Sequence, residues 1–353
     1  MRTLLKNIMT GKDRTAAGAC LKPLLWALSC FYGVIVHFAR ALYRYGICPV
    51  HKARKPVISV GNITAGGVGK TPIVIFIAEY FSRKGLHPVV LTRGYMAAGA
   101  PSEVPSDEAV MMAERLEGVR VVVDPDRVAM VRALEHDAAN DIFIMDDGFQ
   151  HWKLARDLDI VAIDATAPLS QGHVLPRGLL REPLTALRRA GLFVITKTDI
   201  GRDNMDDIRR VLRGIDPQCP VVETVHAPAA LHELWQERGS SDLSPLKDNV
   251  VALSAIGAPD AFEATLRQCG AAVEGVFSYE DHHVYILEDA REIVRFCMDK
   301  KITKVVTTQK DAVKLRGLRE AFQGVSLWVL EINLKVVHGE TEFFSRLDRC
   351  LHP

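Results

Sequence analysis

Residues 61–72, GNITAGGVGKTP, contain the parts of a phosphate-binding loop. Gly66, Gly67 and Gly69 allow backbone N–H groups to approach phosphate oxygens closely. Lys70 can reach the β and γ phosphates of a nucleotide, and the Thr71 hydroxyl can hold Mg²⁺. The residues expected to surround the phosphates are Thr64, Ala65, Gly66, Gly67, Val68, Gly69, Lys70 and Thr71.

This loop departs from the strict pattern Gly-x-x-x-x-Gly-Lys-Ser/Thr, because Thr64 stands where the first glycine is expected. The flanking sequence nevertheless supplies the strand VISV before the loop and the helical run TPIVIFIAEYF after it. A strand, a glycine-rich loop and a helix N-terminus are the parts that a phosphate site requires. We therefore expect the chain to enter the loop by a different turn, at Gly61, and still to bind phosphate.

A second candidate is the acidic pair Asp146 and Asp147, which ends the apolar run DIFIMDD at residues 141–147. Carboxylates at the end of a strand beside a phosphate loop lie at the carboxyl edge of a parallel sheet. Mg²⁺ is commonly bound by one or two carboxylates together with phosphate oxygens and water. We therefore predict a Mg²⁺ site formed by Thr71, Asp146 and Asp147.

The elements that must position these residues are apolar, β-rich runs that alternate with helical stretches. Such alternation is typical of a parallel sheet covered by helices on both faces. The expected strands lie at residues 56–61, 87–92, 119–124, 141–147, 158–164, 192–196, 220–224, 249–255, 304–308 and 325–332. The predicted fold class is α/β: a P-loop NTPase-like, mostly parallel sheet covered by helices, with a second smaller α/β unit and an N-terminal amphipathic helix.

The expected divisions of the chain follow its composition. Residues 1–55 form a basic, membrane-associating segment, residues 56–235 the P-loop core, and residues 236–353 a second α/β lobe. The seam between core and lobe is expected around residues 232–249, and residues 97–109, rich in Ala, Gly, Pro and Ser, are expected to form an exposed loop or lid.

The first 55 residues also differ in charge from the rest. They hold ten Lys or Arg against one acidic residue, a net charge of +9, whereas the remainder holds 34 basic and 42 acidic residues, a net charge of −8. The uncharged run at 24–36 is shorter than the ~20 residues that span a bilayer core. A polar stripe along the predicted helix consists of Ser29, Gly33, His37, Arg40 and Arg44. We predict an interfacial helix whose basic side meets anionic lipid; a helix buried against the body and a spanning segment are the alternatives.

Four further strings are LTRGY (91–95), LPRGLLREPLTAL (175–187), SYEDHHVY (278–285) and VTTQKDAVKL (306–315). Together with the loop and MDDGFQH (145–151), and in the same order, they resemble the tetraacyldisaccharide 4′-kinase family, the lipid A kinases of Gram-negative bacteria. The resemblance covers the chain from about residue 20 to about residue 335, and threonine at position 64 is normal for that family.

The resemblance implies an enzyme that transfers the γ-phosphate of ATP to the 4′-hydroxyl of a tetraacyl glucosamine disaccharide 1-phosphate. It implies ATP and Mg²⁺ as cofactors and a peripheral or N-terminally anchored position on the cytoplasmic face of the inner membrane. The expected partners are the lipid disaccharide and, through the N-terminal helix, the anionic membrane surface, with no nucleic acid and no obligatory protein partner. Seven cysteines without zinc spacing agree with a reducing compartment.

The resemblance also assigns residues. Lys70 is expected to serve phosphate transfer, Arg181 and Glu182 match an Arg-Glu-Pro element near phosphate and substrate, and Arg93 and Tyr95 match an Arg-Gly-Tyr element. An ordinary surface or packing role is the alternative for Arg93, Tyr95 and Arg181.

The base that activates the acceptor is expected in a Gly-Asp-Glu-Pro segment, which here reads Ser106-Asp107-Glu108-Ala109. A sugar hydroxyl is a poor nucleophile, so transfer benefits from a group that takes its proton. We predict that Asp107 accepts the proton and that His282, oriented by Asp281, stabilises or relays it. For Asp107 the alternative is a solvated loop residue, for Asp281 and His282 it is a surface turn, and for His283 it is an ordinary surface or packing role.

The main alternative function is a P-loop switch ATPase or GTPase that acts on a protein partner. Such loops often carry a lysine where this chain has Ala65, and a switch leaves the EDHH string without a role. LFVITKTD (192–199) is similar to the Asn-Lys-x-Asp guanine reader, but Thr196 replaces the asparagine, and a solvated strand end is the alternative. A membrane-bound nucleotide-binding module without chemistry is a third possibility.

Overall fold

The computed structural model describes residues 2–94, 106–167, 169–236, 243–281 and 283–351. These residues form two compact units. Unit 1 takes the described residues within Met1–Gly94, Gly118–Val225 and Lys335–Pro353, and unit 2 takes those within Tyr95–Glu117 and His226–Leu334.

The limits of these units differ from the expected boundary between residues 235 and 236, because the chain passes from one unit to the other inside two long strands. Strand β7 (Val221–Glu233) carries the chain from unit 1 to unit 2, and strand β11 (Ser326–His338) carries it back. Both crossings lie inside strands rather than in loops, so composition did not reveal them. The C-terminal residues from Lys335 onward consequently belong to unit 1.

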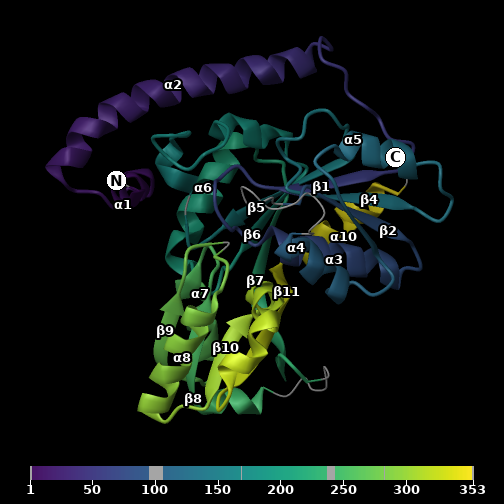
Figure 1. The fold of residues 1–353 in the computed structure, drawn as a ribbon. Helices are drawn as coiled ribbons and strands as arrows, with labels where there is room; N and C mark the ends of the chain where they lie inside the picture. Colours follow the sequence, from purple (N-terminus) through teal and green to yellow (C-terminus); the bar gives the residue numbers. More distant parts are fainter. Residues whose placement is uncertain (1, 95–105, 168, 237–242, 282, 352–353) are drawn as a thin grey trace. The chain divides into compact units, whose positions relative to one another are not determined.

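Unit 1 contains a sheet with β1 near its middle (Figure 1). The strand order is β3-β2-β4-β1-β5-β6-β7, and the pairs from β3 to β7 run parallel. The bounds are β1 (Val57–Gly61), β2 (Pro88–Thr92), β3 (Arg120–Val123), β4 (Ile142–Asp146), β5 (Leu158–Asp164) and β6 (Leu192–Thr196). Val60 lies opposite Asp146 of β4 and Ile160 of β5, so the loop after β1 and the acidic pair after β4 leave the sheet at the same edge.

Helices cover this sheet. They are α3 (Lys70–Arg83), α5 (Arg127–Leu134), α6 (Met205–Ile215) and α10 (Glu340–Arg349), with short 3₁₀ turns η1 (Leu169–Gly172), η2 (Leu184–Arg189) and η3 (Arg202–Asn204). The inner side of α3 buries Ile73, Ile77 and Phe81 completely. On its outer side Phe76 meets Phe343 of α10 at 5.6 Å between ring centroids, which ties the C-terminal helix to the phosphate-loop helix.

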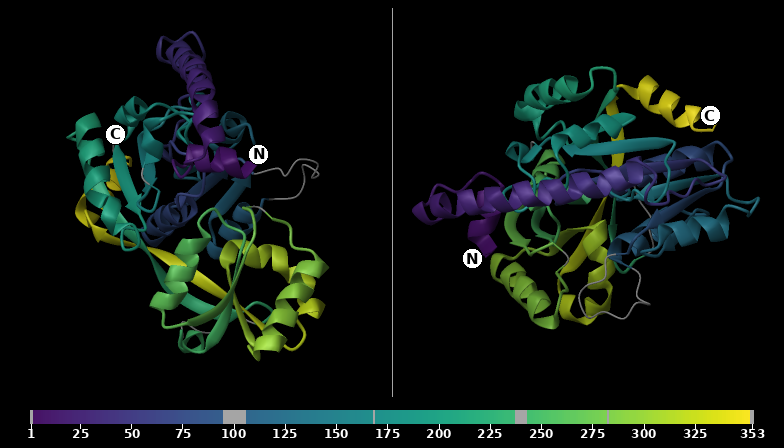
Figure 2. Two further views of the ribbon diagram at one scale, coloured as in Figure 1. Left: turned by 90° about the vertical axis from the view of Figure 1, so that its left-hand side faces the viewer. Right: turned by 90° about the horizontal axis from the view of Figure 1, so that it is seen from above.

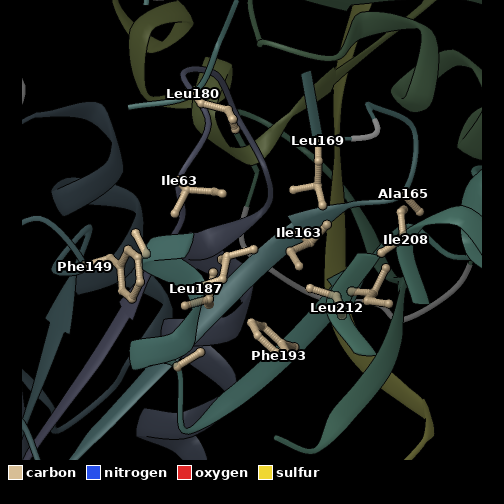
Figure 3. Close-up of a cluster of buried hydrophobic side chains, with 14 of the residues drawn as sticks. Ile63, Phe149, Ile163, Ala165, Leu169, Leu180, Leu187, Phe193, Ile208 and Leu212 are labelled. Atoms are coloured by element: carbon tan, nitrogen blue, oxygen red, sulfur yellow. The ribbon is translucent and has the colours of Figure 1, made fainter. Parts of the chain in front are cut away.

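One buried cluster anchors three segments that carry predicted site residues (Figure 3). Ile63 comes from the loop after β1, Phe149 follows the acidic pair, and Leu180 precedes Arg181; each is at most 1% exposed. These side chains pack with Phe193 of β6 and Leu212 of α6. A close-packed core transmits strain and holds its members in place, so these three segments share one rigid support.

The N-terminus of unit 1 forms α1 (Arg2–Met9) and α2 (Ala16–Arg44). Figures 1 and 2 show α2 as one long continuous helix along the outside of this unit. With 29 residues, it is the helix among those described whose length and composition would allow it to cross a membrane. Its exposed large apolar residues are Leu24, Trp26, Leu28, Phe31, Val34, Ile35 and Phe38.

The polar stripe of α2, which was expected to meet lipid headgroups, divides between the body and the surface. Ser29 is buried and hydrogen-bonded, Gly33 packs beside Val174, and Arg40 approaches Glu182, whereas His37 and Arg44 are exposed. A narrow polar stripe can serve either water or the hydrogen-bonding groups of the body, and its periodicity does not distinguish the two. Most of this stripe serves the body.

Unit 2 contains strands in the order β11-β10-β8-β9, with parallel pairing from β11 to β9. Its further elements are α4 (Asp107–Arg115), η4 (Ser244–Lys247), β8 (Asn249–Ser254), α7 (Pro259–Gln268), β9 (Ala272–Ser278), α8 (Leu287–Lys300), β10 (Lys304–Thr308), α9 (Gln309–Leu315) and η5 (Arg316–Phe322). Along β8, Val250 faces a core under Phe262 of α7, while Val251 faces a core under Ile293 of α8. The sheet is therefore covered on both faces.

Two elements of unit 2 were not expected. Strand β9 was missed because it is an edge strand whose AVEGVFS sequence includes Glu274 and Gly275, and its exposure alternates. Residues 107–109 belong to helix α4 rather than to a loop, because Ser106 caps that helix by accepting a hydrogen bond from the Ala109 amide at 3.3 Å. Serine is a preferred N-cap residue, and acidic residues are favoured in the first turn. The rest of the predicted lid, residues 97–105, lies outside the described residues.

Candidate active site

The predicted phosphate loop joins β1 to the first turn of α3, as expected. Gly66 and Gly69 have φ values of 120° and 81°, which residues with a β carbon rarely adopt, so glycine is required at both positions. Lys70 and Thr71 begin α3, where unpaired backbone N–H groups and the helix dipole favour an anion.

Asn62 explains why threonine is acceptable at position 64. The Asn62 amide nitrogen donates to the Thr64 carbonyl at 2.6 Å and to its hydroxyl at 3.1 Å, and the Asn62 carbonyl oxygen accepts from Lys70 Nζ at 3.2 Å. Thr64 pairs with Leu180 in an antiparallel bridge, an extended conformation that needs no glycine. Gly61 is needed for a close approach rather than for a turn, since a β carbon there would lie 2.5 Å from that of Phe149.

Asp147 lies between two cations of the site. Lys70 Nζ is 3.2 Å from its Oδ1, and Arg181 Nη1 is 2.9 Å from its Oδ2. Burial alone would raise the pKa of Asp147, but the Lys70 and Arg181 charges lower it below its ordinary value. Its φ of 49° is a left-handed conformation that aspartate tolerates better than most residues, and Arg127 Nη1 donates to its carbonyl at 3.1 Å.

Asp146 is buried at the end of β4, where its Oδ2 accepts from the Thr92 hydroxyl at 3.3 Å. Arg127 is also buried. Burial lowers the Arg127 pKa, the carboxylates of Asp146 and Asp147 oppose this, and the charge of Arg93 adds to it. Arg93 itself is exposed at the end of β2. The edge of the sheet thus holds two carboxylates among several cations.

These residues fit a metal that is shared with a nucleotide. Among the residues the structure describes, no group of three or more His, Cys, Asp or Glu side chains could hold a metal by itself. The buried Asp146 carboxylate, the Asp147 carboxylate and the half-buried Thr71 residue supply only part of an octahedral oxygen shell. Mg²⁺ at phosphate loops completes its shell with phosphate oxygens and water, so this incomplete set suits it.

Arg181 and Glu182 lie in a segment bound directly to the loop. The Arg181 amide donates to the Ile63 carbonyl at 2.6 Å, and the Ala65 amide donates to the Leu179 carbonyl at 2.7 Å. Glu182 is 1% exposed and forms a two-pronged pair with Arg189, both contacts at 2.9 Å. Glu182 is thus an organiser of the site, since its carboxylate is already occupied.

Gln150 links this segment to the loop. Its amide nitrogen donates to the Asn62 carbonyl at 2.9 Å and to Glu182 Oε1 at 3.1 Å. One side chain of the MDDGFQH string therefore connects the loop with the Arg-Glu-Pro segment.

The TKTD string, which begins with the last residue of β6, is not a solvated strand end. The Thr196 hydroxyl donates to the Val68 carbonyl at 2.8 Å, and Lys197 pairs with Asp164. Both Thr196 and Lys197 are buried. The Thr196 contact therefore holds the phosphate loop at the Val68 carbonyl.

Unit 2 contains a separate arrangement, the α9 charge cluster, formed by Asp107, Glu108, Asp281, Lys310, Asp311 and Lys314. Lys314 Nζ lies 3.3 Å from Asp107 Oδ2 and 3.6 Å from Asp311 Oδ1. Lys310 Nζ lies 3.0 Å from both Glu108 and Asp281, whose charges raise its pKa against the effect of burial. The segments that carry Asp107 and Asp281 are therefore both attached to α9.

Two predicted residues, Tyr95 and His282, lie outside the described residues. The neighbouring His283 packs against Tyr279 with ring centroids 4.4 Å apart, and its Nε2 lies 2.8 Å from Asp289 Oδ2. This is the packing role expected of one histidine in the pair.

Sequence reasoning missed the residues that organise the site: Asn62, Arg127, Gln150, Arg189, Lys310 and Lys314. Some signals were available. Asn62 and Gln150 stand inside the quoted motifs, and Lys310 and Lys314 are four residues apart in VTTQKDAVKL, the spacing of one helical face. Arg127 and Arg189 gave no local signal, because only the fold brings them to the site.

Comparison with known proteins gives concordant results. The family model described as Tetraacyldisaccharide-1-P 4′-kinase matches residues 21–352. A tetraacyldisaccharide 4′-kinase of Anaeromyxobacter sp. (strain K) is 37% identical over 327 residues, which cover 88% of this chain and 86% of the relative. One from Halothermothrix orenii is 34% identical over 368 residues, covering 95% of each. The crystal structure of "apo" form LpxK from Aquifex aeolicus in complex with ATP has a TM-score of 0.72 and 28% identity, covering 94% of this chain and 99% of that one.

Proposed function

The chain belongs to the tetraacyldisaccharide-1-P 4′-kinase family, and we propose how its own residues carry out that reaction. It is an ATP-using kinase of lipid A biosynthesis that phosphorylates the 4′-hydroxyl of a tetraacylated glucosamine disaccharide 1-phosphate. The observation that carries the mechanism is the contact of Lys70 and Arg181 with Asp147 at the sheet edge where the phosphate loop begins.

On the donor side, the loop amides and the N-terminus of α3 bind the phosphates of ATP. Asn62 and Asp147 hold the Lys70 ammonium at the loop, and Asp147 also orients Arg181. Phosphoryl transfer depends on positioning and on neutralising charge that spreads over the γ-phosphate oxygens, so cations fixed before the reaction lower the barrier. Arg93, Tyr95 and Arg181 are the proposed substrate-binding residues, and Glu182, which was also expected to bind substrate, instead organises the segment through Arg189 and Gln150.

Thr71, Asp146 and Asp147 would hold Mg²⁺. The ion supplies further neutralisation of phosphate charge. Asp146 is kept in place by Thr92, and the Asp147 carbonyl is kept in place by Arg127.

On the acceptor side, Asp107 takes the proton of the 4′-hydroxyl, and His282, oriented by Asp281, stabilises or relays it. The 4′-oxygen forms a bond to the γ-phosphorus as the bond from that phosphorus to the β–γ bridging oxygen breaks, and ADP leaves. The attachment of Asp107 to Lys314 and of Asp281 to Lys310 supports this assignment, because both carboxylates are held by neighbouring turns of α9.

The proposed location is the cytoplasmic face of the inner membrane, with no obligatory protein partner, and the exposed apolar side of α2 supports the contact with a membrane. Trp26 and Phe31 are 55% and 67% exposed, and the segment around them is basic. An interfacial helix buries such side chains at the headgroup boundary. Substitution of Trp26 and Phe31 by serine should weaken binding to anionic liposomes; undiminished binding would contradict the membrane role.

Transfer of label from γ-labelled ATP to purified disaccharide acceptor in mixed micelles tests the function. Labelled lipid and acceptor-dependent ADP release are expected. A P-loop switch would instead release ADP without acceptor and respond to a protein partner or to dimerisation. Wild-type protein that releases ADP at the same rate with and without acceptor would contradict the kinase assignment.

A further inference from the structure

Helix α2 has two sides with different surroundings. The side that faces the body contains Ser29, Tyr32 and Arg40, and the opposite side exposes the large apolar residues. The neighbours Phe31 and Tyr32 illustrate the contrast. Phe31 is 67% exposed, whereas the Tyr32 hydroxyl is hydrogen-bonded to the body.

The contacts of the inward side concentrate on residues 174–182, here called the Arg181 segment. The Ser29 hydroxyl lies 2.8 Å from the Val174 carbonyl and accepts a hydrogen bond from the Arg177 amide at 2.9 Å. The Tyr32 hydroxyl donates to the carbonyl of Arg181 itself at 3.0 Å. Burial raises the pKa of Tyr32, so its hydroxyl stays protonated and remains a donor.

A third contact lies one residue further along. Arg40 Nε is 3.8 Å from the buried carboxylate of Glu182, which also pairs with Arg189 and accepts from Gln150. The inward side of α2 therefore meets main-chain groups at the start and end of the segment, and a buried carboxylate at its end.

The same segment reaches the phosphate site directly. The Arg181 amide bonds to the Ile63 carbonyl of the loop, and its guanidinium bonds to Asp147 at 2.9 Å. Arg181 links the Tyr32 hydroxyl to the Asp147 carboxylate: its carbonyl accepts from Tyr32, and its guanidinium donates to Asp147. A displacement of α2 that breaks the Tyr32 contact therefore acts on Arg181, which holds Asp147 together with Lys70.

These contacts contribute little to the general packing of the unit. The buried positions of the 29-residue helix are Gly18, Leu25, Ser29 and Val36. A helix needed only as part of the core would bury a broad apolar stripe. Here only Leu25 and Val36 among the large apolar residues are buried, most of the others are exposed, and the inward side makes polar contacts.

We propose that α2 is a positioning element for phosphate transfer: Ser29 and Tyr32 hold the Arg181 segment so that the Arg181 guanidinium meets the phosphate site. The helix that carries the lipid-facing side chains thereby also sets the geometry of a phosphate-site cation. This inference rests on the proposed function, because it assigns Arg181 to phosphate transfer. Ser29 and Tyr32 act through Arg181 and do not touch the reacting atoms.

The test uses full-length protein, γ-labelled ATP and disaccharide acceptor in mixed micelles. Tyr32→Phe removes one hydroxyl and keeps the ring, so kcat should fall by roughly 3–10-fold, as expected for one lost hydrogen bond. Liposome binding and the KM for micellar acceptor should not change. The matched variant Phe31→Ser, one position away on the outward side, should show its loss in liposome binding and in KM rather than in kcat.

Ser29→Ala provides a second variant. Tyr32→Phe is also measured in an Arg181→Ala background, which completes a double-mutant cycle. Ser29→Ala should also lower kcat, and Tyr32→Phe should add little once Arg181 is absent, because the two residues act in sequence. Wild-type kcat in both single variants would overturn the proposal, as would losses that multiply independently of Arg181 or that merely follow a lowered Tm. Failure of the kinase assignment is distinct: wild-type protein would then show no acceptor-dependent transfer.

Discussion

The phosphate site of unit 1 and the α9 charge cluster of unit 2 are built with opposite charge. In unit 1 the cations Lys70, Arg127 and Arg181 converge on two carboxylates, Asp146 and Asp147. In unit 2 four carboxylates surround two lysines. An excess of cations suits a polyphosphate, whereas an excess of carboxylates suits removal of a proton.

The two regions also differ in how they are held. The phosphate loop is fixed by main-chain hydrogen bonds from Arg181 and Ala65 and by the start of α3. The α9 charge cluster is held by side-chain ion pairs from three separate segments, which begin at α4, after β9 and at α9. Loss of one side chain in unit 1 should therefore remove chemistry while the site keeps its shape, and the same loss in unit 2 should also disturb the arrangement.

The largest effect is expected for Lys70→Ala. Removal of the ammonium that contacts Asn62 and Asp147 leaves the γ-phosphate charge without its fixed cation, so transfer should fall by roughly 10³-fold or more. Single-turnover transfer and circular dichroism should show lost chemistry in a folded protein. Near-normal turnover would exclude the loop as the catalytic phosphate site.

Asp107→Ala tests the acceptor side. Loss of a general base should lower kcat by about 10²–10⁴-fold while nucleotide binding is preserved. The double variant with His282→Ala should cost less than the product of the single losses, because the two act as one unit. Retention of kcat in Asp107→Ala, or independent multiplication, would remove this pair from the mechanism.

Lys314→Met sharpens the contrast between the units. It leaves Asp311, which is fully buried, without the ammonium at 3.6 Å, and the loss of one partner of a buried pair costs about 3–5 kcal/mol in unfolding free energy. The matched Lys310→Met removes a lysine whose two ion-pair partners are each 34% exposed and should cost less. Urea unfolding measures the loss of unfolding free energy in both variants. Equal losses would show that burial of the ion-pair partner does not distinguish the two lysines.

The smallest effect concerns pH. Burial lowers the pKa of His151 to about 4. Because the unfolded chain binds a proton near pH 6.5 and the folded chain only near 4, this residue should make stability fall as pH drops through that interval and have no further effect below it. Asp147 has a depressed pKa and should add its loss of stability only at more acid pH.

His151→Gln should therefore reduce the difference between urea midpoints measured at pH 7 and pH 5. An unchanged difference would show that His151 is not the group responsible. Because ATP binds the folded protein, bound ATP should raise the urea midpoint at both pH values.

Local pattern was sufficient to identify the parts of the phosphate site. The loop from Gly61 to Thr71 and the pair Asp146 and Asp147 follow apolar runs that could be read as strands, and parallel strands bring their ends to one edge. Glycine spacing and apolar runs are local properties, so they are visible without the fold. The edge strand β9 was missed because its sequence signal is weak. The helical position of Asp107 was missed because the capping residue Ser106 starts a helix within a stretch whose composition is typical of a loop.

What each charge contacts was decided by tertiary structure. The inward stripe of α2, the crossing of the chain inside β7 and β11, and the contacts of Lys310 and Lys314 join residues that are far apart in sequence. A polar side chain of given type can meet water, lipid headgroups or a protein carbonyl with similar local sequence, and only the partner that folding brings to it determines which. The sequence determined which groups the site contains, and long-range packing determined that Ser29 and Tyr32 of α2 contact the Arg181 segment.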